Sequence, residues 1–237
     1  LADVAAAYPG RFAVFGCMPL PFVQPALDEA RRAFDELGAW GINLCTSYPG
    51  LKLDSPELEP FYAYLNERQA LVFLHPDGFC SPEVLDDYGL DWALGAVYDD
   101  ALAATRLIVS GILDRYPNID WIVPHLGGVL LLIDRLDRMW ERYKPWKERI
   151  PNPPTSYYHR LYFDACSHNP NTWLLAKRIF PMDRIVYGTD YPFRGRPNLI
   201  EACELMRGAG FDEGEIEQVM SGNIRPRLQE FLTLAAR

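Results

Sequence analysis

The sequence predicts an α/β protein built around a parallel sheet, and three observations lead to this prediction. The chain has 237 residues, close to the roughly 250 residues of one α/β barrel domain. Apolar segments rich in β-branched and aromatic residues alternate with longer helical patterns, the order expected of repeated βα units. Most of these segments are continuous apolar runs, which indicates strands buried on both faces of a parallel sheet.

Six segments have the character of strands. Each is short and apolar, and a helical pattern or a loop separates it from the next. The predicted strands are Phe12–Met18, Gly41–Thr46, Leu71–His75, Ile119–His125, Leu161–Cys166 and Arg184–Thr189.

The helices between these strands are recognised by their periodicity and by their end signals. Helices commonly have proline inside the first turn and glycine just past the last turn. A capping pair, Asp212 and Glu215, opens a short helix. A last helix carries Pro226 in its first turn. The longer predicted helices are Gln24–Leu37, Ser55–Arg68 and Asp99–Tyr116.

Prolines at 145, 151, 153 and 154 interrupt the segment from Lys144 to Tyr158. Proline is excluded from the interior of regular helices and from central strands. We therefore expect a long loop here, passing over the rim of a barrel. Because the apolar strands on both sides fit one sheet, residues 1–237 are predicted to form a single domain.

Composition narrows the range of partners. The net charge is -9 and the pI about 5.0, a poor match for nucleic acid or an anionic membrane. No apolar run approaches the roughly 20 residues of a transmembrane helix, and the N-terminus carries no secretory signal. The five cysteines form no C-x-x-C pair, which favours reduced thiols and a cytoplasmic location.

Three titratable side chains stand at the ends of predicted strands. His75 and His125 end the third and fourth strands, and Asp190 follows the sixth. Parallel α/β folds place their active sites at the carboxyl ends of the strands. Two imidazoles and one carboxylate that meet there suit a divalent metal of borderline softness.

Each of these residues also has a plain structural interpretation. A histidine at a strand end is often a satisfied polar group, and an aspartate before a turn often caps the backbone. The occurrence of all three at strand ends favours function. For Asp164 and His168, which flank the end of the fifth strand and can line the same pocket, the structural interpretation is preferred.

Several motifs resemble those of one known family. They are His75-Pro76, His125-Leu126-Gly127-Gly128, Phe163-Asp164-Ala165 and the more specific Tyr187-Gly188-Thr189-Asp190-Tyr191-Pro192-Phe193. The chain is similar in these motifs to the amidohydrolase family 2 proteins, the branch of the amidohydrolase superfamily typified by aminocarboxymuconate-semialdehyde decarboxylase.

The resemblance implies a (β/α)8 TIM barrel that holds one divalent metal ion, commonly Zn²⁺. In that pattern His75 is a metal ligand, Asp190 a ligand or an acid/base next to the metal, and His125 the catalytic histidine. The family also suggests that Arg135 binds a substrate carboxylate, reaching the site of a neighbouring subunit in a homodimer.

The chain departs from the family at its start. Members begin with a strand carrying a His-x-His or Glu-x-His pair and then a second strand, and no His-x-His occurs here. The six predicted strands correspond to the third through eighth of the barrel, so we expect an N-terminal part of the barrel to be missing from this sequence. With only two protein ligands, these residues alone are expected to bind metal weakly.

The function expected first is that of a metal-dependent carboxy-lyase acting on a small aromatic or unsaturated carboxylic acid. Two alternatives remain open. One is hydrolysis of an ester, lactone or amide in the same site. The other is a non-catalytic barrel subunit that has lost its metal. A dinucleotide-binding fold is disfavoured because no G-x-G-x-x-G follows any predicted strand.

Overall fold

Six parallel strands form one sheet in the order in which they occur along the chain. The structure is a computed structural model that describes residues 1–76, 83, 85–131, 133–166, 169–192 and 199–229. The sheet order is β1-β2-β3-β4-β5-β6, and every neighbouring pair is parallel. The strands are β1 (Phe15–Cys17), β2 (Gly41–Cys45), β3 (Leu71–His75), β4 (Asp120–Val123), β5 (Leu161–Asp164) and β6 (Ile185–Val186).

The six predicted strands are all present, and the α/β class is confirmed. Most are shorter than expected, because the chain leaves the sheet before the residues at the predicted strand ends. The consecutive parallel order is that of part of a (β/α)8 barrel. In the described residues β1 and β6 are the edges of the sheet, each pairing with one neighbour.

Apolar side chains pack on both faces of the sheet, which explains the continuous apolar runs. The larger cluster lies between the sheet and the helices and includes the fully buried Trp121 and Phe163. A smaller cluster on the other face contains Leu71, Ile122 and Tyr162. Strands of this kind are buried on both sides.

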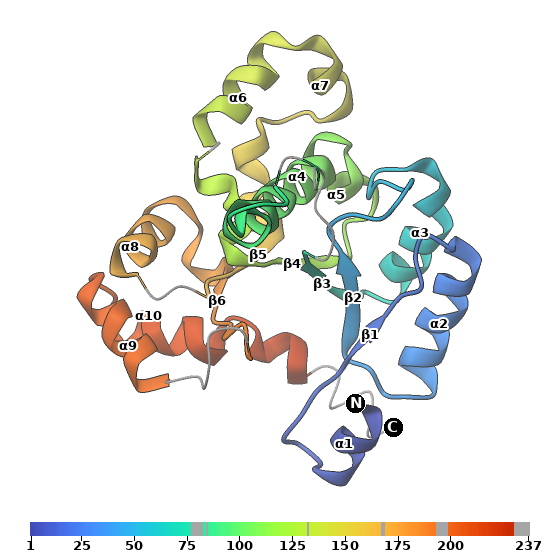
Figure 1. Cartoon of the computed structure of the whole chain (residues 1–237), viewed down its shortest axis with the longest axis horizontal. Coiled ribbons are helices and arrows are strands. Elements are labelled where there is room, and N and C mark those ends of the chain that lie inside the picture. The colour runs from blue at the N-terminus through green and yellow to red at the C-terminus, as the bar shows by residue number, and fades with distance from the viewer. Residues whose placement is uncertain (77–82, 84, 132, 167–168, 193–198, 230–237) are drawn as a thin grey trace.

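Helices surround the sheet, with α2 and α3 on one side of the molecule and α8, α9 and α10 on the other (Figure 1). In the described part of the chain, none of them is both long enough and apolar enough to cross a lipid bilayer. The α-helices are α1 (Ala2–Ala7), α2 (Val23–Asp35), α3 (Glu59–Glu67), α4 (Ala96–Val109), α5 (Ile112–Arg115), α6 (Ile133–Arg142), α7 (Lys144–Arg149), α8 (Pro170–Ile179), α9 (Leu199–Gly208) and α10 (Glu213–Glu217).

One predicted helix differs from the structure in a way that affects the site. The helix expected over Asp99–Tyr116 begins earlier, at Ala96, and breaks at Gly111, whose φ of 76° lies in the left-handed region. Asp99 and Asp100 are therefore inside α4 rather than at its start.

The helix opened by Asp212 is present, with a complete capping box to Glu215.

The loop predicted over Lys144–Tyr158 is wrong. Residues Lys144–Arg149 form α7, and Pro154–Arg160 form a 3₁₀ helix. Both helices have proline in the first turn, where its missing N–H removes no helical hydrogen bond. Together with α6, α7 projects away from the sheet (Figure 1).

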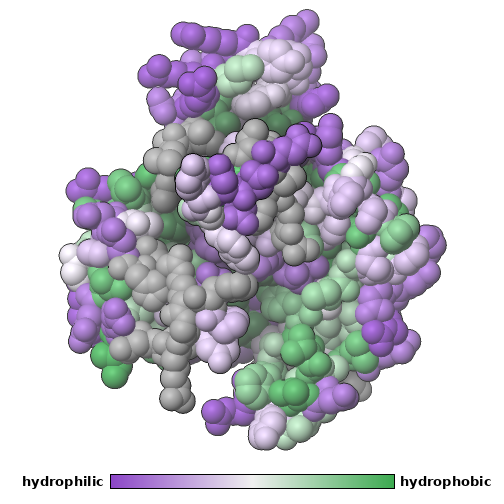
Figure 2. Space-filling model, viewed as in Figure 1, coloured by the Kyte–Doolittle hydropathy of each residue, from purple (hydrophilic) through white to green (hydrophobic). Residues whose placement is uncertain are grey.

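Apolar side chains gather beside the β1 edge of the sheet. They belong to α1, β1 and the segment between them, and Figure 2 shows this apolar surface over the same elements. A cavity of about 440 Å³ lies there, lined mainly by Leu1, Val4, Phe12, Phe15 and Phe73.

Candidate active site

The carboxyl ends of β3, β4, β5 and β6 surround a cavity of about 280 Å³. It contains all three side chains that sequence analysis placed at strand ends. The lining residues are Phe73, His75, Pro124, His125, Asp164, Cys166, Thr189, Asp190 and Tyr191.

The twofold period of β-strands brings most of these side chains to the same face. Tyr162 belongs to the inner apolar cluster, and Asp164 and Cys166 follow it at intervals of two residues. The same spacing leads from Val186, also in that cluster, to Asp190. Alternate residues of a strand share a face, so the apolar cluster forms the floor of the cavity and the polar side chains lie above it.

His125 does not follow this alternation and reaches the cavity through an unusual backbone. Its φ is 50°, and the next three residues also have positive φ. Non-glycine residues in the left-handed region are strained by about 1–2 kcal/mol each. Asp190, with φ 52°, also lies in the left-handed region. Such strain often occurs at functional sites.

A buried carboxylate on α4 orients the imidazole of His125. The Nδ1 atom of His125 lies 2.8 Å from Oδ2 of Asp100, and the Asp100 side chain is fully buried. With Asp100 ionised, Nδ1–H donates to it and Nε2 is left facing the cavity. The turn after His125 packs closely on α4, since a Cβ at Gly128 would lie 2.6 Å from the Val97 carbonyl oxygen.

This pair has shifted pKa values. Burial lowers the pKa of His125, but the hydrogen bonds and charges of Asp100 and Cys166 outweigh burial and raise it to about 10. Burial raises the pKa of Asp100, and the hydrogen bond from His125 opposes that shift. The pair therefore favours a protonated imidazole.

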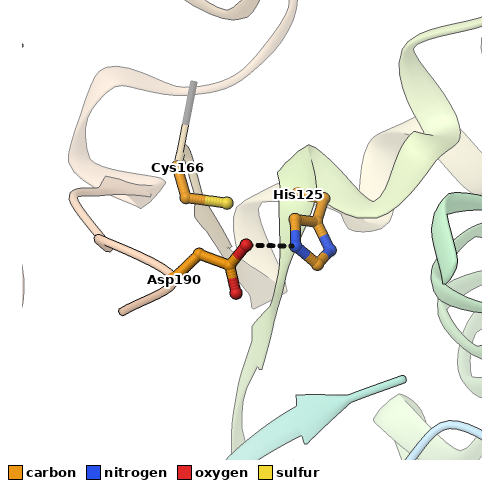
Figure 3. A group of neighbouring side chains, drawn as sticks. All are labelled: His125, Cys166 and Asp190. Atoms are coloured by element: carbon orange, nitrogen blue, oxygen red, sulfur yellow. Dashed lines mark ion pairs between the residues drawn. The ribbon is translucent and has the colours of Figure 1, made fainter. Parts of the chain in front are cut away.

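His125 and Asp190 face each other across the cavity. The Nε2 atom of His125 is 4.0 Å from Oδ2 of Asp190, and the thiol of Cys166 points toward both of them (Figure 3). Donor atoms of the three residues lie within 4.8 Å of one another. Imidazole, thiolate and carboxylate are the three side-chain ligand types of zinc.

Gly188 makes room for a second carboxylate at the cavity. A Cβ on Gly188 would lie 2.2 Å from both carboxylate oxygens of Asp164, which is itself buried. Glycine in a strand often marks such a close approach. Asp164 therefore depends on Gly188 for its position, and it lines the cavity.

We expect Gly188→Ala to destabilise the protein by about 1–3 kcal/mol, because the added methyl group overpacks the buried Asp164 carboxylate. Urea unfolding measures this change. Gly208→Ala is the matched control, since a Cβ there meets nothing within 4 Å. Equal stability of the two variants would contradict the proposed role of Gly188.

The structure brings together His75, His125 and Asp190 but not Arg135. Arg135 is exposed on α6 and is not among the residues lining the cavity. His168 lies outside the described residues.

Sequence analysis missed Asp100 and the thiol of Cys166. Two successive acidic residues on the buried side of a helix were the signal for Asp100, and the spacing of two from Asp164 was the signal for Cys166.

We expect Asp100→Asn to change the tautomer of the neutral His125 ring, since an amide can donate to Nδ1 instead of accepting from it. The loss of the carboxylate also lowers the His125 pKa from its value of about 10. Nitrogen-15 NMR of the imidazole rings reports both changes. Asp99→Asn is a neighbouring control, because Asp99 accepts from Ser47. An unchanged His125 spectrum in Asp100→Asn would contradict this role.

Consecutive parallel strands with imidazole and carboxylate groups at their carboxyl ends define an α/β-barrel protein with a polar site at the barrel mouth. The chain belongs to the amidohydrolase family, because the sequence model of that family matches residues 1–226. This result agrees with the motifs at His75, His125 and Asp190.

Individual relatives agree with this assignment. A 2-amino-3-carboxymuconate-6-semialdehyde decarboxylase from Dictyostelium discoideum is 28% identical over 226 residues, which cover 94% of this chain and 62% of that protein. The chain thus spans less than two thirds of the length of this relative.

Two solved structures share the fold. A 5-carboxyvanillate decarboxylase from Sphingomonas paucimobilis superposes with a TM-score of 0.84 at 21% identity, over 96% of this chain and 70% of that one. A dihydroxybenzoic acid decarboxylase from Polaromonas sp. JS666, with bound manganese and the inhibitor 2-nitroresorcinol, has a TM-score of 0.80 at 24% identity, over 96% and 72% of the two chains.

Proposed function

We propose that this chain carries the active site of a metal-dependent decarboxylase that acts on a small aromatic or unsaturated carboxylic acid. The observation that carries the proposal is the meeting of His125 and Asp190, 4.0 Å apart, over a cavity that also contains His75. Family membership and the decarboxylases among the relatives support it.

The residues at the cavity suit one divalent metal ion. We propose His75 and Asp190 as ligands, because imidazole nitrogen and carboxylate oxygen are common ligands of Zn²⁺. Manganese is bound in the related dihydroxybenzoic acid decarboxylase. Our proposal for this chain is Zn²⁺, since the thiol of Cys166 beside Asp190 favours a softer cation than Mn²⁺. A bound metal would orient the substrate and polarise one of its oxygen atoms.

His125 is placed to transfer the proton that decarboxylation requires. Its Nε2 faces the cavity while Nδ1 is held by Asp100, and the Asp100 carboxylate stabilises the imidazolium form. We propose that Nε2 donates a proton to the carbon bearing the carboxylate. The bond to the carboxylate then breaks, its electron pair returns to the carbon framework, and CO₂ leaves. Solvent reprotonates His125.

The walls of the cavity fit an aromatic or unsaturated acid. Phe73, Pro124 and Tyr191 present apolar surface next to the polar groups. A ring packed on these side chains would exclude water from His125 and strengthen the interactions made there.

Arg135 is proposed to bind the carboxylate of a substrate held by a neighbouring subunit. It is exposed on α6, and a guanidinium binds carboxylates through two parallel hydrogen bonds. This role requires an oligomer, for which we propose a homodimer, to be checked by light scattering. The cysteines that the structure describes, Cys17, Cys45, Cys166 and Cys203, form no disulfide, which supports a cytoplasmic location.

The test is CO₂ release by the full natural protein from a panel of small aromatic and unsaturated carboxylic acids. We expect CO₂ evolution that stops when the metal is removed by a chelator and returns when Zn²⁺ is added. Hydrolysis of esters or lactones without any CO₂ release would overturn the proposal in favour of a hydrolase.

A further inference from the structure

Three different ligand types meet in the cavity. The donor atoms of His125, Cys166 and Asp190 all lie within 4.8 Å of one another. The residues come from the turn after β4, the end of β5 and the loop after β6, and their side chains converge (Figure 3). The proposed function uses His125 as a proton donor and does not make the thiol of Cys166 a metal ligand.

The surroundings of these side chains are those of a metal-binding site. A metal-bound histidine usually donates its other ring N–H to a carboxylate, which holds the ring in place. His125 has this arrangement, because Asp100 lies 2.8 Å from its Nδ1 and is fully buried. The side of the ring that faces Cys166 and Asp190 is the side available for a ligand bond.

Burial also favours binding of a soft cation. Cys166 is only 6% exposed, and Asp190 and His125 are partly buried beside it. A thiolate among the ligands selects thiophilic cations over Mg²⁺ and Mn²⁺.

We propose that His125, Cys166 and Asp190 form a site for a thiophilic divalent cation such as Zn²⁺ or Cd²⁺, which shares Asp190 with the proposed pair His75 and Asp190 but uses a different set of ligands. The thiol of Cys166 and the Nε2–H of the His125 imidazolium each lose a proton to solvent when the cation binds. Ligands of a tetrahedral zinc ion are separated by about 3.3–3.8 Å, given bond lengths of about 2.0–2.3 Å. Since the donors lie within 4.8 Å of one another, they need to approach by at most about 1–1.5 Å.

Occupation of this site has a consequence for the reaction, and this part of the inference rests on the proposed function. A cation bound to Nε2 of His125 removes the group that donates the proton. Excess Zn²⁺ or Cd²⁺ is therefore expected to inhibit the enzyme, and Cys166 is the residue that makes it sensitive.

Binding is tested with Co²⁺ and Cd²⁺ on the full natural protein, without any substrate. Wild-type protein loaded with Co²⁺ should show a thiolate-to-cobalt charge-transfer band in the near ultraviolet. Cys166→Ser should lose this band and bind Cd²⁺ at least about tenfold more weakly. Cys203→Ser is the matched control and should behave as the wild type. A band that is absent from the wild type, or that persists in Cys166→Ser, overturns the proposal.

Two further measurements separate the possible failures. X-ray absorption of Zn²⁺-loaded wild-type protein should show sulfur at about 2.3 Å from zinc, and a shell without sulfur overturns the proposal even when Cys166→Ser does not fold. In assays of CO₂ release, Cys166→Ser should tolerate at least about tenfold more Cd²⁺ than the wild type; equal inhibition of both contradicts the inhibitory role. Absence of CO₂ release from every acid counts against the proposed function, while the Co²⁺ spectrum still decides the cation site.

Discussion

Replacing His125 with alanine is expected to lower kcat for CO₂ release by about 10²–10⁴-fold, the usual contribution of a positioned proton-transfer group. The reason is geometric. Nε2 of His125 faces the cavity 4.0 Å from Asp190, and Asp100 holds the opposite side of the ring. Stopped assays of CO₂ release by the full natural protein measure the change, and circular dichroism confirms that the variant is folded.

His159→Ala is the matched control for this substitution. His159 is an exposed histidine in the 3₁₀ helix before β5, at the amino end of that strand and away from the cavity. We expect its kcat to equal that of the wild type. Unchanged turnover in His125→Ala would remove the proton-transfer role of this residue.

Asp190→Asn is expected to weaken metal binding by at least about 10–100-fold, the loss seen when even an indirect partner of a metal site is removed. The amide has no charge to offer a divalent cation, while the shape of the side chain is preserved. Bound metal is measured by elemental analysis after dialysis against buffer of fixed Zn²⁺ concentration. Activity should fall in parallel with the metal content.

The control for this second substitution lies at the other end of the same strand. Asp183 is exposed and pairs with Arg184 at 3.6 Å, just before β6. Asp183→Asn should bind metal as the wild type does. If Asp190→Asn retains a full equivalent of metal, Asp190 is not a ligand.

The prediction of a loop over Lys144–Tyr158 failed because composition alone does not locate proline within an element. Pro145 and Pro154 each stand in the first turn of a helix, where proline is tolerated. Contacts between side chains that are far apart in the sequence then hold residues 144–160 in place. One example is Asp137, which accepts hydrogen bonds from both the backbone N–H and the hydroxyl of Thr155.

The sequence by itself determined the parallel sheet and the strand ends at which chemistry occurs. Short apolar runs such as Leu71–His75 predict which segments form buried strands. The residues that stand at the ends of these strands follow directly from those runs. His75, His125 and Asp190 were identified as candidates in this way, because the topology of a parallel sheet collects its carboxyl ends at one edge.

Only the tertiary structure decided how these side chains are held. Asp100 contacts His125 across 25 residues of chain, and Asp164 packs against Gly188 from a different strand. The thiol of Cys166 lies beside His125 and Asp190. Strand alternation turns Cys166 toward the cavity, and His125 and Asp190 have a left-handed backbone there. Such contacts depend on the packing of helix on sheet and on backbone dihedral angles, neither of which a local pattern of residue types encodes.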